Sequence, residues 1–254
     1  MHNQTTIFLN KEWRWSKFQK YIMSNLDQYN CQEYKIPSEY SYMESKYGSK
    51  NENKNVILYT WAVKNERINF CRSVCINSPS YCVLNFLIIP SSKYNIPFFG
   101  IDFVSLPNYH LLVLDFQPSL NINKQFDKDL LKQLSKIKND FHQNVPMAAK
   151  MSVKIAKFFS PAVIWSKLPK EEKSEKLINN HLFPTFQKYL DIYLNVLFNA
   201  KKVDFEIQKE LSKGQNNYLE YRKSKDPARP MLKALFGHTF TESFINNLLF
   251  KITK

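Results

Sequence analysis

The sequence predicts an α+β fold, with a central antiparallel sheet flanked by helices and a C-terminal half that is mostly helical. Between residues 56 and 117, five apolar segments typical of strands are separated by short polar connections. Short connections indicate antiparallel neighbours, because parallel strands need long crossovers. From residue 173 onward, apolar residues recur at helical spacing instead. A length of 254 residues suits one domain spanning residues 1–254.

The strands are inferred from apolar, β-branched and aromatic segments that end at turn residues. They are expected at Val56–Lys64, Ile68–Ile76, Cys82–Pro90, Phe98–Ser105, His110–Gln117 and Ala162–Leu168. The segment that begins at Cys82 is apolar on both faces, which indicates a strand buried on both sides of the sheet. Residues 34–50 have the composition of an extended segment and a loop, and residues 1–9 that of a loose arm.

Helices are expected where apolar residues recur every three to four positions. They cover residues 12–26, 123–139, 173–200, 205–223, a short stretch ending at 236, and 239–252. Pro184 is expected to interrupt the third of these helices, since proline removes a backbone donor. Asp204 is placed to cap the helix that begins at Phe205. Gly237 is expected to end the short helix before the last one.

The charge balance indicates an anionic partner. Lysine and arginine number 36 against 22 acidic residues, for a formal net charge of +14. Nucleic acid, an anionic membrane and an acidic protein all fit this charge. No nucleic-acid-binding motif is present and the lysines are scattered, so we expect no nucleic acid partner.

No secretory signal, transit peptide or 18-residue apolar segment is visible, so we expect a soluble protein without a membrane partner. We place it in the cytoplasm, or in the plastid stroma of a eukaryotic phototroph.

Several kinds of active site are disfavoured. Among the four cysteines, only Cys71 and Cys75 are four positions apart, and they lie in a strand-like segment. We therefore expect reduced thiols and no metal site. No Ser-His-Asp or Cys-His pattern occurs. The sequence also contains no glycine-rich phosphate loop, so it does not suggest a bound nicotinamide or flavin.

Three polar residues interrupt the apolar strands, namely Asn85, Asp102 and Asp115. A carboxylate in a strand centre is costly to desolvate unless it is paired. For Asp102 we consider a structural carboxylate and a buried acid that delivers a proton near neutral pH. For Asp115 the structural role is favoured, and Asn85 is either a core amide or part of a site.

A second candidate site lies at a break between two predicted helices. Asp226 precedes Pro227, which excludes it from helical geometry. A helix-capping role explains the aspartate locally. Arg222 lies one turn earlier on the preceding helix and is able to face the same side.

Six short segments, in order between Trp13 and Phe250, carry a resemblance to a known family. They are V-L-N-F, P-F-F-G-I-D, L-D-F-Q-P, F-F-S-P, Y-R-K-S-K-D-P-A-R and F-I-N-N-L-L-F. The chain resembles the ferredoxin-dependent bilin reductases, which reduce open-chain tetrapyrroles. This resemblance implies an α/β/α sandwich that binds the bilin between the sheet and the C-terminal helices. It also implies no bound cofactor, reduced ferredoxin as the external electron donor, and bilin radical intermediates.

The resemblance also implies roles for individual residues. Asp102 matches the sheet aspartate that protonates the bilin, and Asp226 matches the helical-side aspartate of members that reduce the A-ring diene. Arg222 matches a position near that aspartate in the phycoerythrobilin-forming branch. Asn85 and Ser73 stand where phycocyanobilin-forming members have a catalytic histidine and a glutamate, which argues against phycocyanobilin as the product.

Further local features are most similar to the phycoerythrobilin-forming branch. They are W-R-W at 13–15, S-L-P-N-Y-H-L-L at 105–112 and F-F-S-P-A-V-I-W-S-K-L-P at 158–169. The last of these contains Lys167, which we expect near a propionate of the bilin.

The implied reaction reduces 15,16-dihydrobiliverdin at its A-ring diene to phycoerythrobilin, with two electrons and two protons. The implied partners are ferredoxin, dihydrobiliverdin and the upstream reductase that forms it, and we expect a monomer. Two alternatives remain. One is another reductase of the family, either similar to phytochromobilin synthase or acting on biliverdin directly, and the other is a bilin-binding carrier without turnover.

Overall fold

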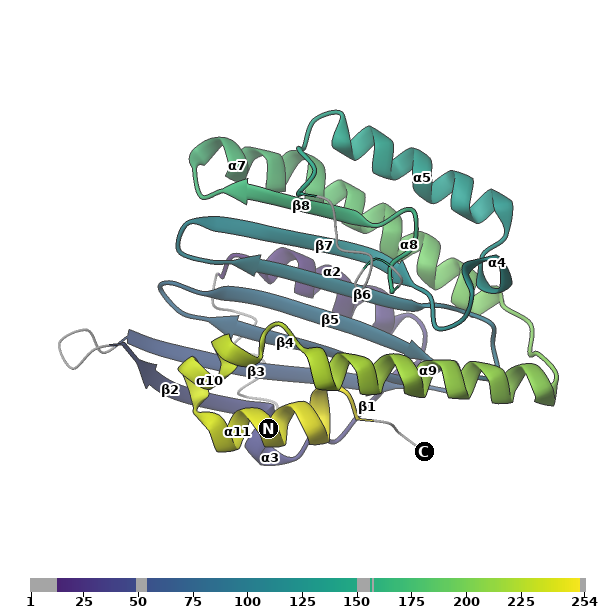
Figure 1. Cartoon of the computed structure of the whole chain (residues 1–254), viewed down its shortest axis with the longest axis horizontal. Helices are drawn as coiled ribbons and strands as arrows, with labels where there is room; N and C mark the ends of the chain where they lie inside the picture. Colours follow the sequence, from purple (N-terminus) through teal and green to yellow (C-terminus); the bar gives the residue numbers. More distant parts are fainter. Residues whose placement is uncertain (1–12, 49–53, 150–155, 157, 252–254) are drawn as a thin grey trace.

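The computed structural model describes residues 13–48, 54–149, 156 and 158–251 (Figure 1). Its strands are β1 (Gln32–Glu33), β2 (Tyr42–Tyr47), β3 (Lys54–Lys64), β4 (Ile68–Asn77), β5 (Cys82–Pro90), β6 (Phe98–Ser105), β7 (Tyr109–Gln117) and β8 (Ile164–Pro169). Its α-helices are α2 (Ser16–Asp27), α3 (Ser38–Ser41), α4 (Ile122–Gln125), α5 (Lys128–His142), α7 (Glu172–Leu177), α8 (Phe183–Asn199), α9 (Phe205–Lys225), α10 (Arg229–Phe236) and α11 (His238–Phe244).

The strands form one eight-stranded sheet in which every described pairing is antiparallel. From β3 to β8, the order in the sheet follows the order in the chain. Both β1 and β2 pair with the outer edge of β3, at different positions along it. This arrangement confirms the antiparallel sheet that the short connections predict.

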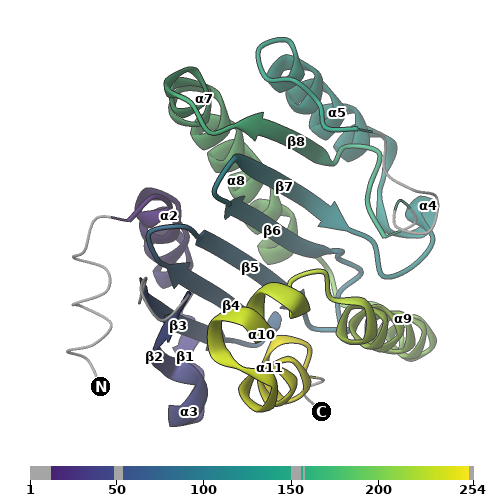
Figure 2. The ribbon, with the colours of Figure 1, turned by 60° about the vertical axis from the view of Figure 1, so that its left-hand side comes forward.

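Helices cover both faces of the sheet (Figures 1 and 2). One apolar core lies between the sheet and α2, α5 and α8, and a second lies between the sheet and α9, α10 and α11. Because successive side chains of a strand point to opposite faces, Phe99, Ile101 and Phe103 of β6 enter the first core. Gly100 and Asp102 therefore face the C-terminal helices. The expected α/β/α sandwich is confirmed.

The expected helix over residues 123–139 is in fact two helices. The first, α4, ends at Gln125, and α5 begins after Asp127. The side chain of Asp127 caps α5, since its Oδ1 accepts a hydrogen bond from the Leu130 amide at 2.7 Å. The extended conformation of Phe126 ends α4 and the Asp127 cap starts α5, and the apolar spacing alone shows neither.

The expected interruption at Pro184 is wrong. Helix α7 continues into α8 through a π-helical turn, Ile178–Leu182, so Pro184 lies in the first turn of α8. Proline is tolerated there because the longer hydrogen bonds of the π turn do not require its missing N–H. A second π turn, Ile245–Leu249, follows α11 where a continuous helix to residue 252 was expected.

Strand β2 lies within residues 34–50, which the sequence indicates only as extended chain and loop, and β1 lies directly before that segment. Their residues are exposed or half-buried, and so lack the apolar pattern of a buried strand.

The last strand begins at Ile164, two residues later than expected. The expected arm over residues 1–9 lies outside the described residues. Among the described residues, no helix is long and apolar enough to span a membrane.

Candidate active site

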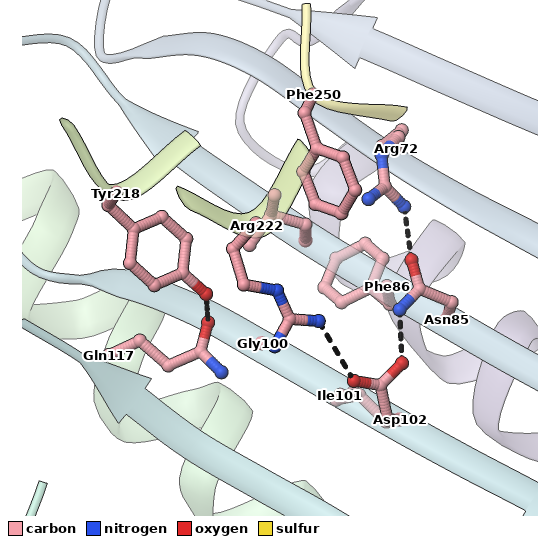
Figure 3. A pocket seen from close by; sticks show the side chains of 11 residues that line it. Arg72, Asn85, Phe86, Gly100, Ile101, Asp102, Gln117, Tyr218, Arg222 and Phe250 are labelled. Atoms are coloured by element: carbon pink, nitrogen blue, oxygen red, sulfur yellow. Dashed lines mark hydrogen bonds and ion pairs between the residues drawn. The ribbon is translucent and has the colours of Figure 1, made fainter. Parts of the chain in front are cut away.

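A pocket lies between the sheet and the C-terminal helices, with about 240 Å³ of empty space that is partly open to solvent (Figure 3). Its floor comes from β4, β5, β6 and β7, and its roof from α9 and the chain after the second π turn. The lining residues are Arg72, Asn85, Phe86, Leu87, Gly100, Ile101, Asp102, Gln117, Tyr218, Arg222 and Phe250.

Three of the predicted site residues meet in this pocket. Asn85 and Asp102 are direct partners across β5 and β6, so their side chains share a face of the sheet. The side-chain amide of Asn85 donates a hydrogen bond to Oδ1 of Asp102. On the other side of the carboxylate, Nη2 of Arg222 lies 3.6 Å from Oδ2 of Asp102. The Asp102 side chain is still 29% exposed, so its carboxylate is accessible from the pocket.

Arg72 completes this polar row and was not among the predicted site residues. Its Nη1 donates to Oδ1 of Asn85 at 2.5 Å, and its Nε donates to the Leu249 carbonyl at 3.0 Å. Burial lowers the pKa of Arg72 to about 10, although the carboxylates of Asp102 and Asp226 oppose that effect. A charged residue in the centre of an apolar strand marks Asp102 in the sequence, and it marks Arg72 in the same way.

Asp226 follows α9 directly, in the extended conformation expected for a residue before proline. Its Oδ1 accepts a hydrogen bond from the Ala228 amide at 3.0 Å, so the local capping role is present. Burial raises the pKa of Asp226, and Asp102 adds to this effect while Arg222 opposes it. Asp226 thus belongs to the same electrostatic cluster as Asp102, although it is not among the residues that line the pocket.

The opposite wall of the pocket is built from Tyr218, Gln117 and Gly100. The Tyr218 hydroxyl donates a hydrogen bond to Oε1 of Gln117, and burial raises the pKa of Tyr218 to about 12. Gly100 leaves room for Gln117, because a Cβ at residue 100 would lie 2.6 Å from Gln117 Oε1. None of these residues was singled out from the sequence, since no charge marks them.

The remaining predicted residues lie apart from the pocket lining. Lys167 on β8 is exposed, with its Nζ 4.0 Å from the centre of the Tyr109 ring. Asp115 is fully buried and accepts hydrogen bonds from the Ser160 amide at 2.8 Å and the Ser160 hydroxyl at 2.5 Å. These contacts fit the structural role expected for Asp115. Ser73 pairs with Phe86 on the neighbouring strand.

The chemistry of the site is that of acids and cations. Asp102 and Asp226 are able to hold or release protons, and Arg72 and Arg222 attract an anionic ligand. Within the part of the chain that the structure describes, no three histidine, cysteine, aspartate or glutamate side chains are grouped for a metal ion.

Known proteins are similar to this chain in sequence and in fold. The profile of the family described as "Ferredoxin-dependent bilin reductase" matches residues 19–251. A phycoerythrobilin:ferredoxin oxidoreductase of Prochlorococcus marinus strain MIT 9301 is 62% identical, over 97% of this chain and 98% of that protein. One from strain NATL1A is 36% identical over 94% of this chain and 93% of that protein.

Among solved structures, the fold is similar to that of phytochromobilin synthase from tomato in complex with biliverdin. The TM-score is 0.78 at 22% identity, over 93% of this chain and 83% of that one. The match of the family profile over most of the chain, the relatives at high identity and the shared sandwich fold agree. The chain belongs to the ferredoxin-dependent bilin reductases, a family of oxidoreductases.

Proposed function

We propose that this reductase converts 15,16-dihydrobiliverdin to phycoerythrobilin by reducing the A-ring diene. Two electrons arrive one at a time from reduced ferredoxin through bilin radicals, and two protons come from the protein. The 62% identical relative carries the name phycoerythrobilin:ferredoxin oxidoreductase, which supports this product. The observation that carries the proposal is the cluster of Asp102, Arg222 and Asp226 between the sheet and the C-terminal helices.

The two aspartates are suited to deliver the two protons from opposite layers. Asp102 lies on the sheet with its carboxylate accessible from the pocket, and Asp226 lies at the end of α9. The raised pKa of Asp226 favours a carboxyl that keeps its proton until a reduced bilin accepts it. Arg222 lies within electrostatic range of both aspartates and is proposed to stabilise each one after it gives up its proton.

The bilin requires more room than the pocket offers. Ligand pockets for medium-sized organic molecules measure about 300–1,000 Å³, whereas the cavity volume that corresponds to such values is only about 10 Å³ here. We propose that the bilin displaces Arg222 from Asp102 and occupies the space between them. Asn85 would then contact the bilin from the sheet, and the exposed Lys167 would bind a propionate at the edge of the sheet.

The positive charge of the chain fits both partners. Ferredoxin is an acidic protein and the bilin carries two propionates, so the net charge of +14 raises the encounter rate with each. We propose that residues 1–254 act as one domain and as a monomer, and that dihydrobiliverdin is handed over by the reductase that forms it.

An anaerobic assay tests this function. Purified protein is mixed with reduced ferredoxin and either 15,16-dihydrobiliverdin or biliverdin, followed by absorption, and the products are resolved by chromatography. We expect phycoerythrobilin from dihydrobiliverdin and no A-ring product from biliverdin. Reduction of biliverdin instead would assign the chain to a different branch of the family. Binding of dihydrobiliverdin without conversion would favour a carrier.

A further inference from the structure

We propose that Arg72 is a positioning residue: it fixes the orientation of the Asn85 amide, and thereby holds Asp102 with one oxygen bound to the sheet and the other facing the ligand. This inference rests on the proposed function for its catalytic consequence. The orientation itself is a property of the protein alone.

The contacts of the Asn85 side chain define the orientation. Its Oδ1 accepts from Nη1 of Arg72, and its Nδ2 donates to Oδ1 of Asp102 (Figure 3). An arginine has only donors, so the amide cannot turn its NH₂ group toward Arg72 without losing that bond. The buried cation therefore selects the one orientation in which Asn85 supports the Asp102 carboxylate.

Arg72 is itself held firmly. It is only 1% exposed, and its Nε donates to the Leu249 carbonyl at the end of the second π turn. Its guanidinium carbon lies 5.9 Å from the centre of the Phe250 ring. Because one donor is fixed to the C-terminal helical layer, the planar guanidinium presents the other donor to Asn85 in a fixed direction.

The consequence appears at Asp102. With Oδ1 held by Asn85, the other oxygen, Oδ2, faces Arg222 at 3.6 Å. If the amide turned over, two oxygen acceptors would face each other and the carboxylate would lose this support. The groups that act on Asp102 are thus Asn85 from β5, Arg72 from β4, and Tyr218 and Arg222 from α9, together with the charge of Asp226.

Two readouts test the proposal on the full chain, and the first needs no turnover. The side-chain NH₂ signals of Asn85 are assigned in nitrogen-15 NMR spectra by their loss in Asn85→Ala. In wild-type protein we expect slow exchange of these protons with solvent. In Arg72→Met we expect shifted signals and exchange at least tenfold faster. Arg67→Met is the matched control, since Arg67 donates to the Leu197 and Ala200 carbonyls, outside the pocket lining.

The second readout is a double-mutant cycle on the rate of dihydrobiliverdin reduction. Arg72→Met and Asn85→Ala should each slow turnover about tenfold or more, and the double variant should be no slower than Asn85→Ala. Multiplied losses, or unchanged Asn85 signals in Arg72→Met, would overturn the proposal. If wild-type protein binds the bilin without converting it, the proposed function fails while the NMR readout still decides the role of Arg72. Should Arg72→Met not fold, Arg72→Lys, which keeps the charge but loses the planar group, is measured in its place.

Discussion

Replacing Asp226 with asparagine should remove the proposed proton donor while leaving the fold in place. The Ala228 amide donates to Oδ1 of Asp226, and an asparagine oxygen is able to accept the same bond. Burial raises the pKa of Asp226. Ionisation of Asp226 therefore destabilises the folded protein above that pKa, and this destabilisation disappears as the pH falls through it. Asparagine never carries this cost, but it also lacks the attraction of an ionised Asp226 to Arg222. Because these two effects oppose each other, we expect the free energy of unfolding at neutral pH to change by at most about 1 kcal/mol.

The effect on catalysis should be much larger. A positioned general acid contributes about 10²- to 10⁴-fold to a rate, which corresponds to roughly 3–5 kcal/mol in the activation barrier. We therefore expect Asp226→Asn to reduce the rate of A-ring reduction by that factor, with dihydrobiliverdin binding nearly unchanged. Single-turnover absorption measurements with reduced ferredoxin give the rate, spectral titration gives the affinity, and urea unfolding gives the stability.

A matched control lies at the other end of the same helix. Asp204 caps the start of α9, and its Oδ1 accepts from the Ile207 amide at 2.9 Å. Asp204→Asn changes the same functional group outside the pocket lining and should turn over normally. If Asp226→Asn also formed phycoerythrobilin at the wild-type rate, Asp226 would have no part in proton delivery.

Three further outcomes are expected. Gly100→Ala should displace Gln117 from Tyr218, because the new Cβ would lie 2.6 Å from Gln117 Oε1. Spectral titration should then show about tenfold weaker bilin binding, and an unchanged affinity would contradict this prediction. Burial lowers the pKa of His110 from 6.5 to about 4. As the pH drops from 6.5 to about 4, the unfolded chain therefore binds a proton at His110 that the folded protein does not bind, and the free energy of unfolding should fall. Urea unfolding of His110→Gln should show a smaller fall, and an identical pH profile would exclude His110 as the cause. Ferredoxin-supported turnover at subsaturating ferredoxin should drop roughly tenfold between low and high salt because the chain carries +14, whereas salt-independent rates would argue against electrostatic docking.

The sequence predicted the sheet well because each hairpin is a local feature. Short polar turns and apolar strands identify β3 to β7 within a few residues. It missed β1 and β2, whose exposed and half-buried residues carry no apolar pattern, and it placed a break at Pro184 where a π turn preserves the helix. The pairing of an exposed strand and the formation of a π turn both depend on tertiary packing, which the spacing of apolar residues in the sequence does not show.

The site was predicted only in part, because only some of its residues carry a local signal in the sequence. Asp102 and Asn85 stand out because polar residues in a buried strand conflict with local preference. Arg72 shows the same conflict but was not among the predicted site residues. Gln117 and Tyr218 could not be found this way, because their role depends on the packing of α9 over Gly100, which brings together residues that are distant in the chain.

The strand order of the sheet has a consequence for biogenesis. Because β3 to β8 pair in chain order, each new hairpin can join its predecessor as the polypeptide leaves the ribosome. Arg222 and Asp226 come after all the strands of the sheet have been synthesised, and the Leu249 carbonyl that anchors Arg72 comes later still. A nascent chain can therefore contain a nearly complete sheet and still lack the bilin site until α9 and the second π turn have packed on it.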